Sequence, residues 1–379
     1  MTATLLDSML FAAADQNASD VHLTAGTPAL MRVDGDLMPI PGYPETLPAD
    51  WLEEAMSALM SPGHRAEFLE RNEVDLAHAV PGLGRLRVNA FRQRGVVAVA
   101  LRFVPGRAFT LAELGAPAIA ADLAKRPRGL VLLTGPTGSG KSTTLTAMVD
   151  IINTELPVHV ITIEDPIEFY HESKRSLVHQ REVGADTGSF AEALRRVLRQ
   201  DPDVILVGEL RDPESIRTAL SAAETGHLVL STLHTQGASK SINRIVDVFP
   251  ADQQDQIRTQ LGDTLQGVIS QTLLPLAQRS GRTVATEVLI NTPAVANMIR
   301  EGQIAQLYSA MQAGAGLGMH TLDQDLKRLV SEGTVARHVA EAYAVDPATL
   351  KDVHVRPRDL DADAWTHHAG EWRHEDAGV

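Results

Sequence analysis

The chain has 379 residues, of which 44% are hydrophobic, and this is enough for roughly two or three domains with buried cores. It contains no cysteine, which excludes disulfides and zinc sites built on cysteine pairs. A formal net charge of -14 and an aromatic content of 4% disfavour a nucleic acid as the main partner.

The sequence shows neither a secretory signal nor a membrane span. Residues 1–10 lack the basic segment that opens a secretory signal. No uncharged apolar run approaches the roughly 18 to 20 residues that a membrane span needs. We therefore expect a cytosolic protein.

Residues 1–103 predict a small α+β domain. The expected elements are a strand over 19–26, a hairpin over 29–40 with an Asp34-Gly35 turn, a helical stretch over 49–72, and strands over 74–80, 84–93 and 96–104. In the strand over 84–93, Leu86 and Val88 alternate with Arg87 and Asn89, which predicts one apolar and one polar face. A Pro/Gly-containing linker is expected over 104–117.

A second domain over 118–354 has the pattern of a mostly parallel α/β sheet, in which apolar strands alternate with helices. The strand-like runs are 130–135, 158–165, 204–210 and 227–235. Beyond Phe249 the pattern is mainly helical, including the stretch over 252–274. Residues 355–379 mix polar residues without periodicity and are expected to form a flexible tail.

A phosphate-binding loop follows the first of these strands. The sequence GPTGSGKST fits the pattern G-x-x-x-x-G-K-[ST] between an apolar run and a helix. Lys141 is expected to reach the β- and γ-phosphates of ATP, and the Ser142 hydroxyl to ligate Mg²⁺. The residues expected to bind the nucleotide are Gly135, Pro136, Thr137, Gly138, Ser139, Gly140, Lys141, Ser142 and Thr143.

Carboxylates follow two other strands. An ordinary Walker B strand ends in Asp, but here Gly208 stands at that point and Glu209 follows, so we assign Glu209 as the group that orients or deprotonates the attacking water. A surface ion pair with Arg211 or Arg217 is the alternative. The run ITIEDPIEF supplies Glu164 as a second catalytic candidate and Asp165 as a candidate metal ligand; a solvated loop is the alternative there.

Two histidines bracket the strand over 227–235. A histidine at such a site can hydrogen-bond the γ-phosphate while ATP is present and release it afterwards. His234 and His227 are therefore nucleotide-binding candidates. A structural hydrogen-bonding role is the alternative for both.

Four segments together resemble one superfamily. GPTGSGKST, ITIEDPIEF, ILVGELRD and TGHLVLSTLHT resemble, in order and spacing, the Walker A, Asp box, Walker B and His box of secretion-type ATPases. Further segments resemble the type IV pilus retraction (twitching motility) ATPases along most of residues 1–345: ASDVHLTAG, RVDGDL, GRLRVNAF, HQREVG, VDVFP, TPAVANMIRE and LGMHTLDQDL.

This resemblance implies a fold, an activity and partners. It implies a homohexameric ring with a PAS-like first domain and a RecA-like second domain, using ATP and Mg²⁺ to drive pilin subunits back into the membrane. The implied partners are an inner-membrane platform protein and the rest of the pilus machinery, reached by peripheral association with the cytoplasmic face of the inner membrane. No nucleic acid is implied. The family's γ-phosphate-contacting arginines fall on Arg87 and Arg102, with Arg85 and the Arg195/Arg199 pair as further candidates.

The sequence departs from the family pattern at one position, and other classes of ATPase are alternatives. Ala296 stands where the family segment usually has an arginine, which concerns force coupling rather than hydrolysis. Pilus-assembly and type II secretion ATPases are rivals, although they typically carry a four-cysteine zinc module. A weakly hydrolysing accessory paralogue that acts as a binding module is a further alternative.

Overall fold

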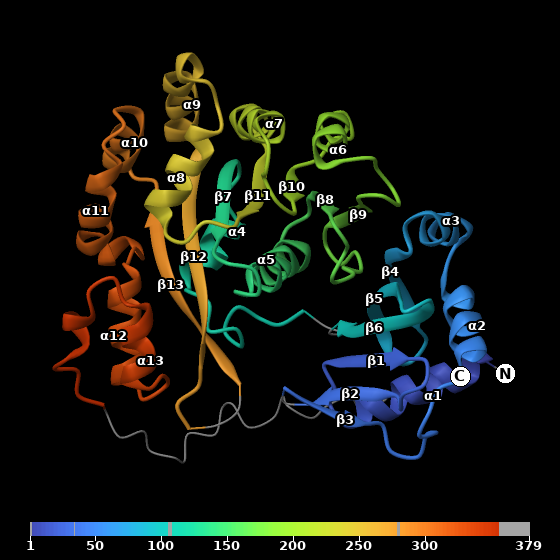
Figure 1. Cartoon of the computed structure of the whole chain (residues 1–379). Coiled ribbons are helices and arrows are strands. Elements are labelled where there is room, and N and C mark those ends of the chain that lie inside the picture. Colours follow the sequence, from blue (N-terminus) through green and yellow to red (C-terminus); the bar gives the residue numbers. More distant parts are fainter. Residues whose placement is uncertain (1, 34, 105–107, 279–280, 356–379) are drawn as a thin grey trace. The chain divides into compact units, whose positions relative to one another are not determined.

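The computed structural model describes residues 2–33, 35–104, 108–278 and 281–355, which form two units (Figure 1). The first unit ends before residue 108. Its elements in chain order are α1 (Thr2–Asp15), β1 (Asp20–Thr24), β2 (Leu30–Val33), β3 (Asp36–Pro39), α2 (Ala49–Leu59), α3 (Pro62–Arg71), β4 (Glu73–Val80), β5 (Gly84–Gln93) and β6 (Val96–Val104).

The first unit is built on a six-stranded antiparallel sheet in the order β3-β2-β1-β6-β5-β4. The alternation expected in β5 is present: Leu86 and Val88 are fully buried, whereas Arg87 is exposed. The helices cover the apolar face, and α1 contributes Leu6 and Leu10 from the same side of its helix. The prediction of a small α+β domain is confirmed, although α1 was not expected and Asp34 of the expected turn lies outside the described residues.

The second unit contains the parallel sheet. Its strands are β7 (Gly129–Thr134), β8 (His159–Glu164), β9 (Leu177–Glu182), β10 (Val204–Val207), β11 (Leu228–Leu233), β12 (Leu265–Pro275) and β13 (Arg282–Ile290). They form a seven-stranded sheet in the order β13-β12-β7-β11-β10-β8-β9, in which β13 alone runs antiparallel to its neighbour.

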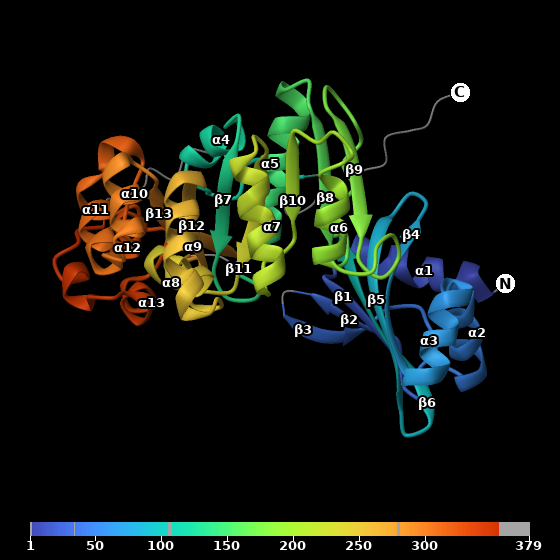
Figure 2. The same ribbon diagram turned by 90° about the horizontal axis from the view of Figure 1, so that it is seen from above.

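Helices cover both faces of this sheet (Figure 2). The helices are α4 (Ile119–Ala124), α5 (Lys141–Glu155), α6 (Phe190–Val197), α7 (Pro213–Glu224), α8 (Ala238–Asp247), α9 (Ala251–Thr264), α10 (Pro293–Arg300), α11 (Leu307–Ala313), α12 (Leu322–Ser331) and α13 (Arg337–Tyr343), with short 3-10 turns η1 (Ile304–Gln306), η2 (Ala315–Leu317) and η3 (Pro347–Leu350). α4 and α5 pack on one face, and α6 to α11 pack on the other.

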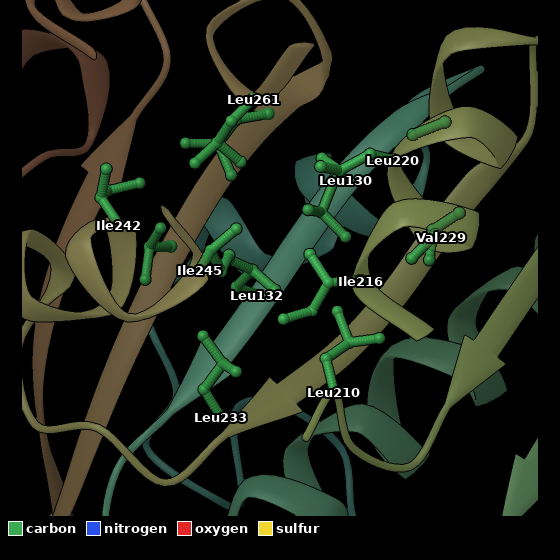
Figure 3. Packing of buried hydrophobic residues seen from close by; sticks show 14 of the residues in the cluster. Leu130, Leu132, Leu210, Ile216, Leu220, Val229, Leu233, Ile242, Ile245 and Leu261 are labelled. Atoms are coloured by element: carbon green, nitrogen blue, oxygen red, sulfur yellow. The ribbon is translucent and has the colours of Figure 1, made fainter. Parts of the chain in front are cut away.

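Burial on both faces explains the uninterrupted apolar runs that the sequence shows. Every residue of β7 is buried. Leu130 and Leu132 pack toward α7 and α8, as Figure 3 shows, and Val131 and Leu133 pack toward α5. The prediction of a mostly parallel α/β sheet is therefore confirmed for this unit.

The structure corrects the expectation of a helix over 252–274. The helical pattern ends at Thr264, and Leu265 begins the long strand β12, which pairs with β7 on one side and β13 on the other. β12 is buried on both faces, so its sequence lacks the period-2 alternation that would have identified it as a strand. The rest of the C-terminal part, from α10 to η3, is helical as expected.

Three further expectations concern segments at the ends of the units. Residues 108–117, expected as part of a linker, belong to the second unit, where Leu111 packs in the cluster around α5. The expected tail over 355–379 lies outside the described residues from 356 onward. Among the described residues, no helix combines the length and apolar character that spanning a bilayer requires.

Candidate nucleotide-binding site

The motifs of the second unit follow adjacent strands. β7, β11, β10 and β8 are neighbours in the sheet and run parallel, so their carboxyl ends lie at one edge. The phosphate loop follows β7, His234 follows β11, Glu209 follows β10, and Asp165 follows β8. The fold thus places side chains from distant parts of the sequence along the edge where α/β sheets bind ligands.

The phosphate loop, residues 135–140, depends on glycine. Gly138 and Gly140 have φ angles of 76° and 86°, which favour residues without a Cβ atom. At Gly135 a Cβ atom would collide with the backbone oxygen of Gln271 in β12, so no larger residue fits. Such a turn directly before a helix binds phosphate groups through backbone N–H groups and the helix dipole.

Lys141 is the first residue of α5 and is buried against the loop. Its ammonium group donates hydrogen bonds to the carbonyl oxygens of Gly135, at 2.8 Å, and Pro136, at 2.9 Å. Burial lowers the pKa of Lys141, and the negative charge of Glu209 opposes this shift. The lysine is thus held at the loop by neutral acceptors, which the charged oxygens of a nucleotide would replace.

Glu209 is connected to the phosphate loop through His234. Glu209 Oε2 lies 3.1 Å from His234 Nε2, and His234 Nδ1 lies 3.5 Å from the Thr137 hydroxyl. Because a carboxylate only accepts, we assign the proton of the neutral ring to Nε2, which leaves Nδ1 to accept from Thr137. The other oxygen of Glu209 is ion-paired with Arg211. The ion pair between Glu209 and Arg211, proposed as the alternative, is therefore present. The second oxygen of Glu209 nevertheless contacts His234, which in turn contacts Thr137 of the loop.

Gly208 occupies the position at which an ordinary Walker B strand carries Asp. Its N–H donates to the Ile163 carbonyl at 2.8 Å, which fixes the end of β10 against β8. A Cβ atom at Gly208 would lie 3.3 Å from the Ile163 carbonyl oxygen and 3.3 Å from the Phe190 ring. A side chain at position 208 would therefore press against the Phe190 ring and the Ile163 carbonyl.

Glu164 ends β8 and is held by two donors. It accepts hydrogen bonds from the Thr162 hydroxyl at 2.6 Å and from Gln180 Nε2 at 3.1 Å. Burial raises the pKa of Glu164, whereas these two bonds favour the charged form and lower it. Gln180 also donates to the Phe169 carbonyl at 2.8 Å and accepts from the His171 N–H at 2.7 Å, so it fixes Glu164 relative to the following loop.

The candidate metal ligands occupy different places. The Ser142 hydroxyl is exposed in the first turn of α5 and offers the hard oxygen that Mg²⁺ prefers. Asp165 is also exposed, but it follows β8, which β10 and β11 separate from β7, so the sheet does not place it beside Ser142. The described residues form no group of three acidic or histidine side chains able to hold a metal by themselves.

His227 lies at the opposite edge of the sheet. It precedes β11, its carbonyl oxygen accepts from the Gly129 N–H at 3.0 Å at the start of β7, and its Nδ1 lies 3.0 Å from the Ala222 carbonyl. The length of β11 separates it from His234. The structure therefore does not bring His227 to the phosphate loop of its own chain.

Arg87 and Arg102 belong to the first unit. They are direct cross-strand neighbours on β5 and β6, and both are exposed on the same face of the sheet. Arg102 Nε donates to Asp20 on β1 at 2.7 Å. Their role toward a nucleotide stays a prediction.

Comparison with known proteins decides the family. The sequence model described as "Type II/IV secretion system protein" matches residues 1–342. The chain belongs to the type II/IV secretion system protein family. Within this family, the curated "Type IV pilus retractation ATPase PilT" of Pseudomonas aeruginosa is 50% identical over 342 residues, covering 90% of this chain and 98% of that protein.

Two further proteins that are similar to this chain are also described by pilus retraction or twitching motility. A "Twitching motility protein" of Neisseria gonorrhoeae is 48% identical over 321 residues, covering 85% of each chain. The solved structure titled "Crystal Structure of the Pilus Retraction Motor PilT and Bound ADP" is 47% identical, has a TM-score of 0.85, and is matched over 90% of this chain and 97% of that one. The expected membership of the secretion-type ATPases is confirmed.

The sequence analysis did not predict three residues that hydrogen-bond to side chains of the site and of α5: Thr162, Gln180 and Gln271. Thr162 lies two positions before Glu164, on the same side of β8, which is a readable signal. Gln180 lies in HQREVG, which was noted only as part of the resemblance. Gln271 of β12 is buried and donates to Thr144 of α5 at 2.9 Å; the expected helix over 252–274 concealed it.

Proposed function

We propose that this protein is a motor ATPase of the type IV pilus machinery that hydrolyses ATP to power pilus retraction and twitching motility. The observation that carries the proposal is the chain of contacts from Glu209 through His234 to Thr137, because it joins a water-orienting carboxylate to the phosphate loop. Identity of 50% over 90% of the chain to a pilus retraction ATPase supports the biological role.

Each residue at this edge of the sheet has a role in hydrolysis. The loop and Lys141 bind the phosphates, with the lysine exchanging its carbonyl partners for phosphate oxygens. Glu209 orients the attacking water and accepts its proton, because its two oxygens keep free lone pairs beside their contacts with Arg211 and His234. His234 is placed to register whether the γ-phosphate is present. Glu164 and Asp165 complete the acidic border of the site at β8.

Mg²⁺ would be held through Ser142 and the nucleotide, and it would neutralise charge on the β- and γ-phosphates. Six subunits would assemble into a ring, in which Arg87 and Arg102 reach the γ-phosphate of a neighbour. The ring would dock peripherally on an inner-membrane platform protein at the cytoplasmic face of the membrane.

A deletion strain of the source organism tests the direction of force. Loss of the gene should leave more or longer surface pili and no twitching, and the wild-type gene should restore motility whereas Glu209→Gln should not. Bald cells would instead indicate an assembly ATPase. Twitching that survives in the deletion strain, together with weak turnover by the purified protein, would indicate an accessory paralogue.

A further inference from the structure

Glu287 is a buried carboxylate that lies outside the nucleotide site. Glu287 lies in β13 with only 8% of its surface exposed. It stands directly opposite Ser270 of β12 across the antiparallel pair. Burying a carboxylate is costly unless its oxygens are hydrogen-bonded, so its partners identify what it holds.

Glu287 and Ser270 together hold the beginning of α8. The Gly237 N–H donates to the Ser270 hydroxyl at 2.8 Å, and the next N–H, of Ala238, donates to Glu287 Oε1 at 2.7 Å. Gly237, the N-cap of α8, has no side chain that could cap the helix itself. The cap is therefore supplied by the sheet, and a carboxylate at this position also interacts favourably with the helix dipole.

The residue before Glu287 in β13 holds a second helix. The Thr286 N–H donates to Asp325, in the first turn of α12, at 2.7 Å. Burial raises the pKa of Glu287, whereas the N–H groups of Ala238 and Leu322 favour its charged form. Adjacent residues of β13 thus hold the start of α8 and the first turn of α12.

The start of α8 is close in sequence to His234. Residues 235–237 connect His234 to α8, and Thr235 is tied back to the first turn of that helix by a 2.6 Å contact between its hydroxyl and that of Ser241. The Ser241 hydroxyl in turn donates to the Gly237 carbonyl at 2.8 Å. Because only residues 235–237 join His234 to α8, a displacement of α8 would move His234 relative to Glu209 and Thr137.

We propose that Glu287 is a positioning residue that fixes His234 through α8. This inference rests on the proposed ATPase function for its kinetic consequence. Glu287 itself touches neither nucleotide nor the attacking water. Its loss should impair turnover through His234, with nucleotide binding largely intact.

The test compares Glu287→Ala with Asp323→Ala in the full-length protein. Asp323 is a matched control, because it is a buried carboxylate of α12 that accepts from the Val345 and Asp346 N–H groups, at 2.7 Å and 2.9 Å, and does not hold α8. We expect Glu287→Ala to lower kcat about tenfold or more with nucleotide Kd changed less than about threefold. Asp323→Ala should lower the melting temperature but keep kcat at temperatures where it is folded. Glu287→Gln, which keeps one acceptor oxygen, should fall between wild type and Glu287→Ala.

A double-mutant cycle with His234→Ala separates positioning from general damage. If Glu287 acts through His234, its removal should cost little further activity in the His234→Ala background. Fully multiplicative losses, or an equal loss of kcat in Asp323→Ala, would overturn the proposal.

Amide hydrogen exchange decides the matter independently of activity, and so distinguishes failure of this proposal from failure of the proposed function. Peptides covering residues 234–241 should exchange faster in Glu287→Ala than in wild type or Asp323→Ala. Unchanged exchange in these peptides would refute the role of Glu287 even if the protein proved not to hydrolyse ATP.

Discussion

Glu209 faces two partners, Arg211 and His234, and each of them is a hydrogen-bond donor. Glu209→Gln keeps the size of the side chain but removes the negative charge that accepts a proton from water. We expect it to bind nucleotide normally and to lose roughly 10²- to 10⁴-fold in turnover. Steady-state ATPase assays and binding of a fluorescent nucleotide measure the two effects separately.

The control at the same edge is Lys141→Ala, which should abolish tight nucleotide binding because it removes the charge held at the loop. Glu209→Gln that hydrolyses ATP within a few-fold of wild type would contradict the assignment. Glu164, which ends β8 at the same edge, would then be the candidate.

A second expectation at this scale concerns His171, in the loop that Gln180 holds. Burial lowers the pKa of His171 to about 4, and Lys174 adds to this shift while Asp150 opposes it. Since the folded pKa is below the unfolded value of about 6.5, the neutral ring contributes stability that is present above pH 6.5 and is lost as the pH falls toward 4. His171→Asn should make the stability less dependent on pH in this window, by roughly 1 to 3 kcal/mol.

Urea denaturation at several pH values between 4 and 7 measures this difference. His338→Asn, at an exposed histidine, is the control and should leave the wild-type pH profile unchanged. Parallel profiles for wild type and His171→Asn would show that His171 is not buried in its neutral form.

At the scale of elements, α9 and α10 approach closely at Gly262. A Cβ atom there would lie 3.0 Å from the Ala296 carbonyl oxygen and 3.1 Å from Arg300 Cγ. Ala296 is itself buried, at 8% exposure. We therefore expect Ala296→Arg to leave turnover nearly unchanged, since it lies outside the nucleotide motifs, but to destabilise the fold by roughly 1 to 3 kcal/mol through overpacking.

Thermal unfolding and ATPase assays of Ala296→Arg check this, with Ala294→Arg on the exposed side of the same helix as the matched variant. Ala294→Arg should change neither quantity. A large change in turnover for Ala296→Arg alone would mean that α10 is coupled to the nucleotide site.

The elements that could be predicted from the sequence are those with a clear period or cap. β5 alternates from Leu86 to Ala90, and α7 is capped by Asp212, whose side chain accepts from the Ser215 N–H at 2.8 Å. β12 could not be predicted in this way. Buried on both faces and joined to α9 without Gly or Pro between them, it has neither a period nor a boundary that reveals a strand.

The same distinction applies to the site. Motif spacing predicted the loop, Glu209, Glu164 and His234 as site residues, because each lies at or just beyond the carboxyl end of an apolar strand. Gln180 and Glu287 act through contacts between strands and helices that are remote in sequence, and local pattern carries no information on such contacts. The order of strands in the sheet is what brings them to their partners.

At the scale of the whole molecule, the proposed ring makes Arg87 a residue that acts on a neighbour. An arginine placed on the γ-phosphate in trans contributes roughly 10³- to 10⁵-fold in known phosphoryl-transfer systems. Arg87→Ala should therefore be inactive when assembled, with nucleotide affinity largely retained. Mixing it with Lys141→Ala should restore some hydrolysis, because an intact loop in one subunit can receive Arg87 from the other.

ATPase assays of mixed subunits, with exchange followed by labelled protein, measure this complementation. Activity no greater than the sum of the two variants, where exchange is demonstrated, would show that Arg87 acts within its own chain or serves only structure. Activity per subunit should also rise with protein concentration through the range where rings form.

The packing around Gly208 also limits how this protein can change over evolution. A single base change converts some glycine codons into aspartate codons, so the acid of an ordinary Walker B strand is genetically near. At Gly208 a Cβ atom would lie 3.3 Å from the Phe190 ring and from the Ile163 carbonyl oxygen, so these neighbours would have to give way by a few tenths of an ångström. An acid at position 208 would therefore have to be accompanied by a small movement of the Phe190 ring, and shape makes this substitution costlier than the genetic code alone suggests.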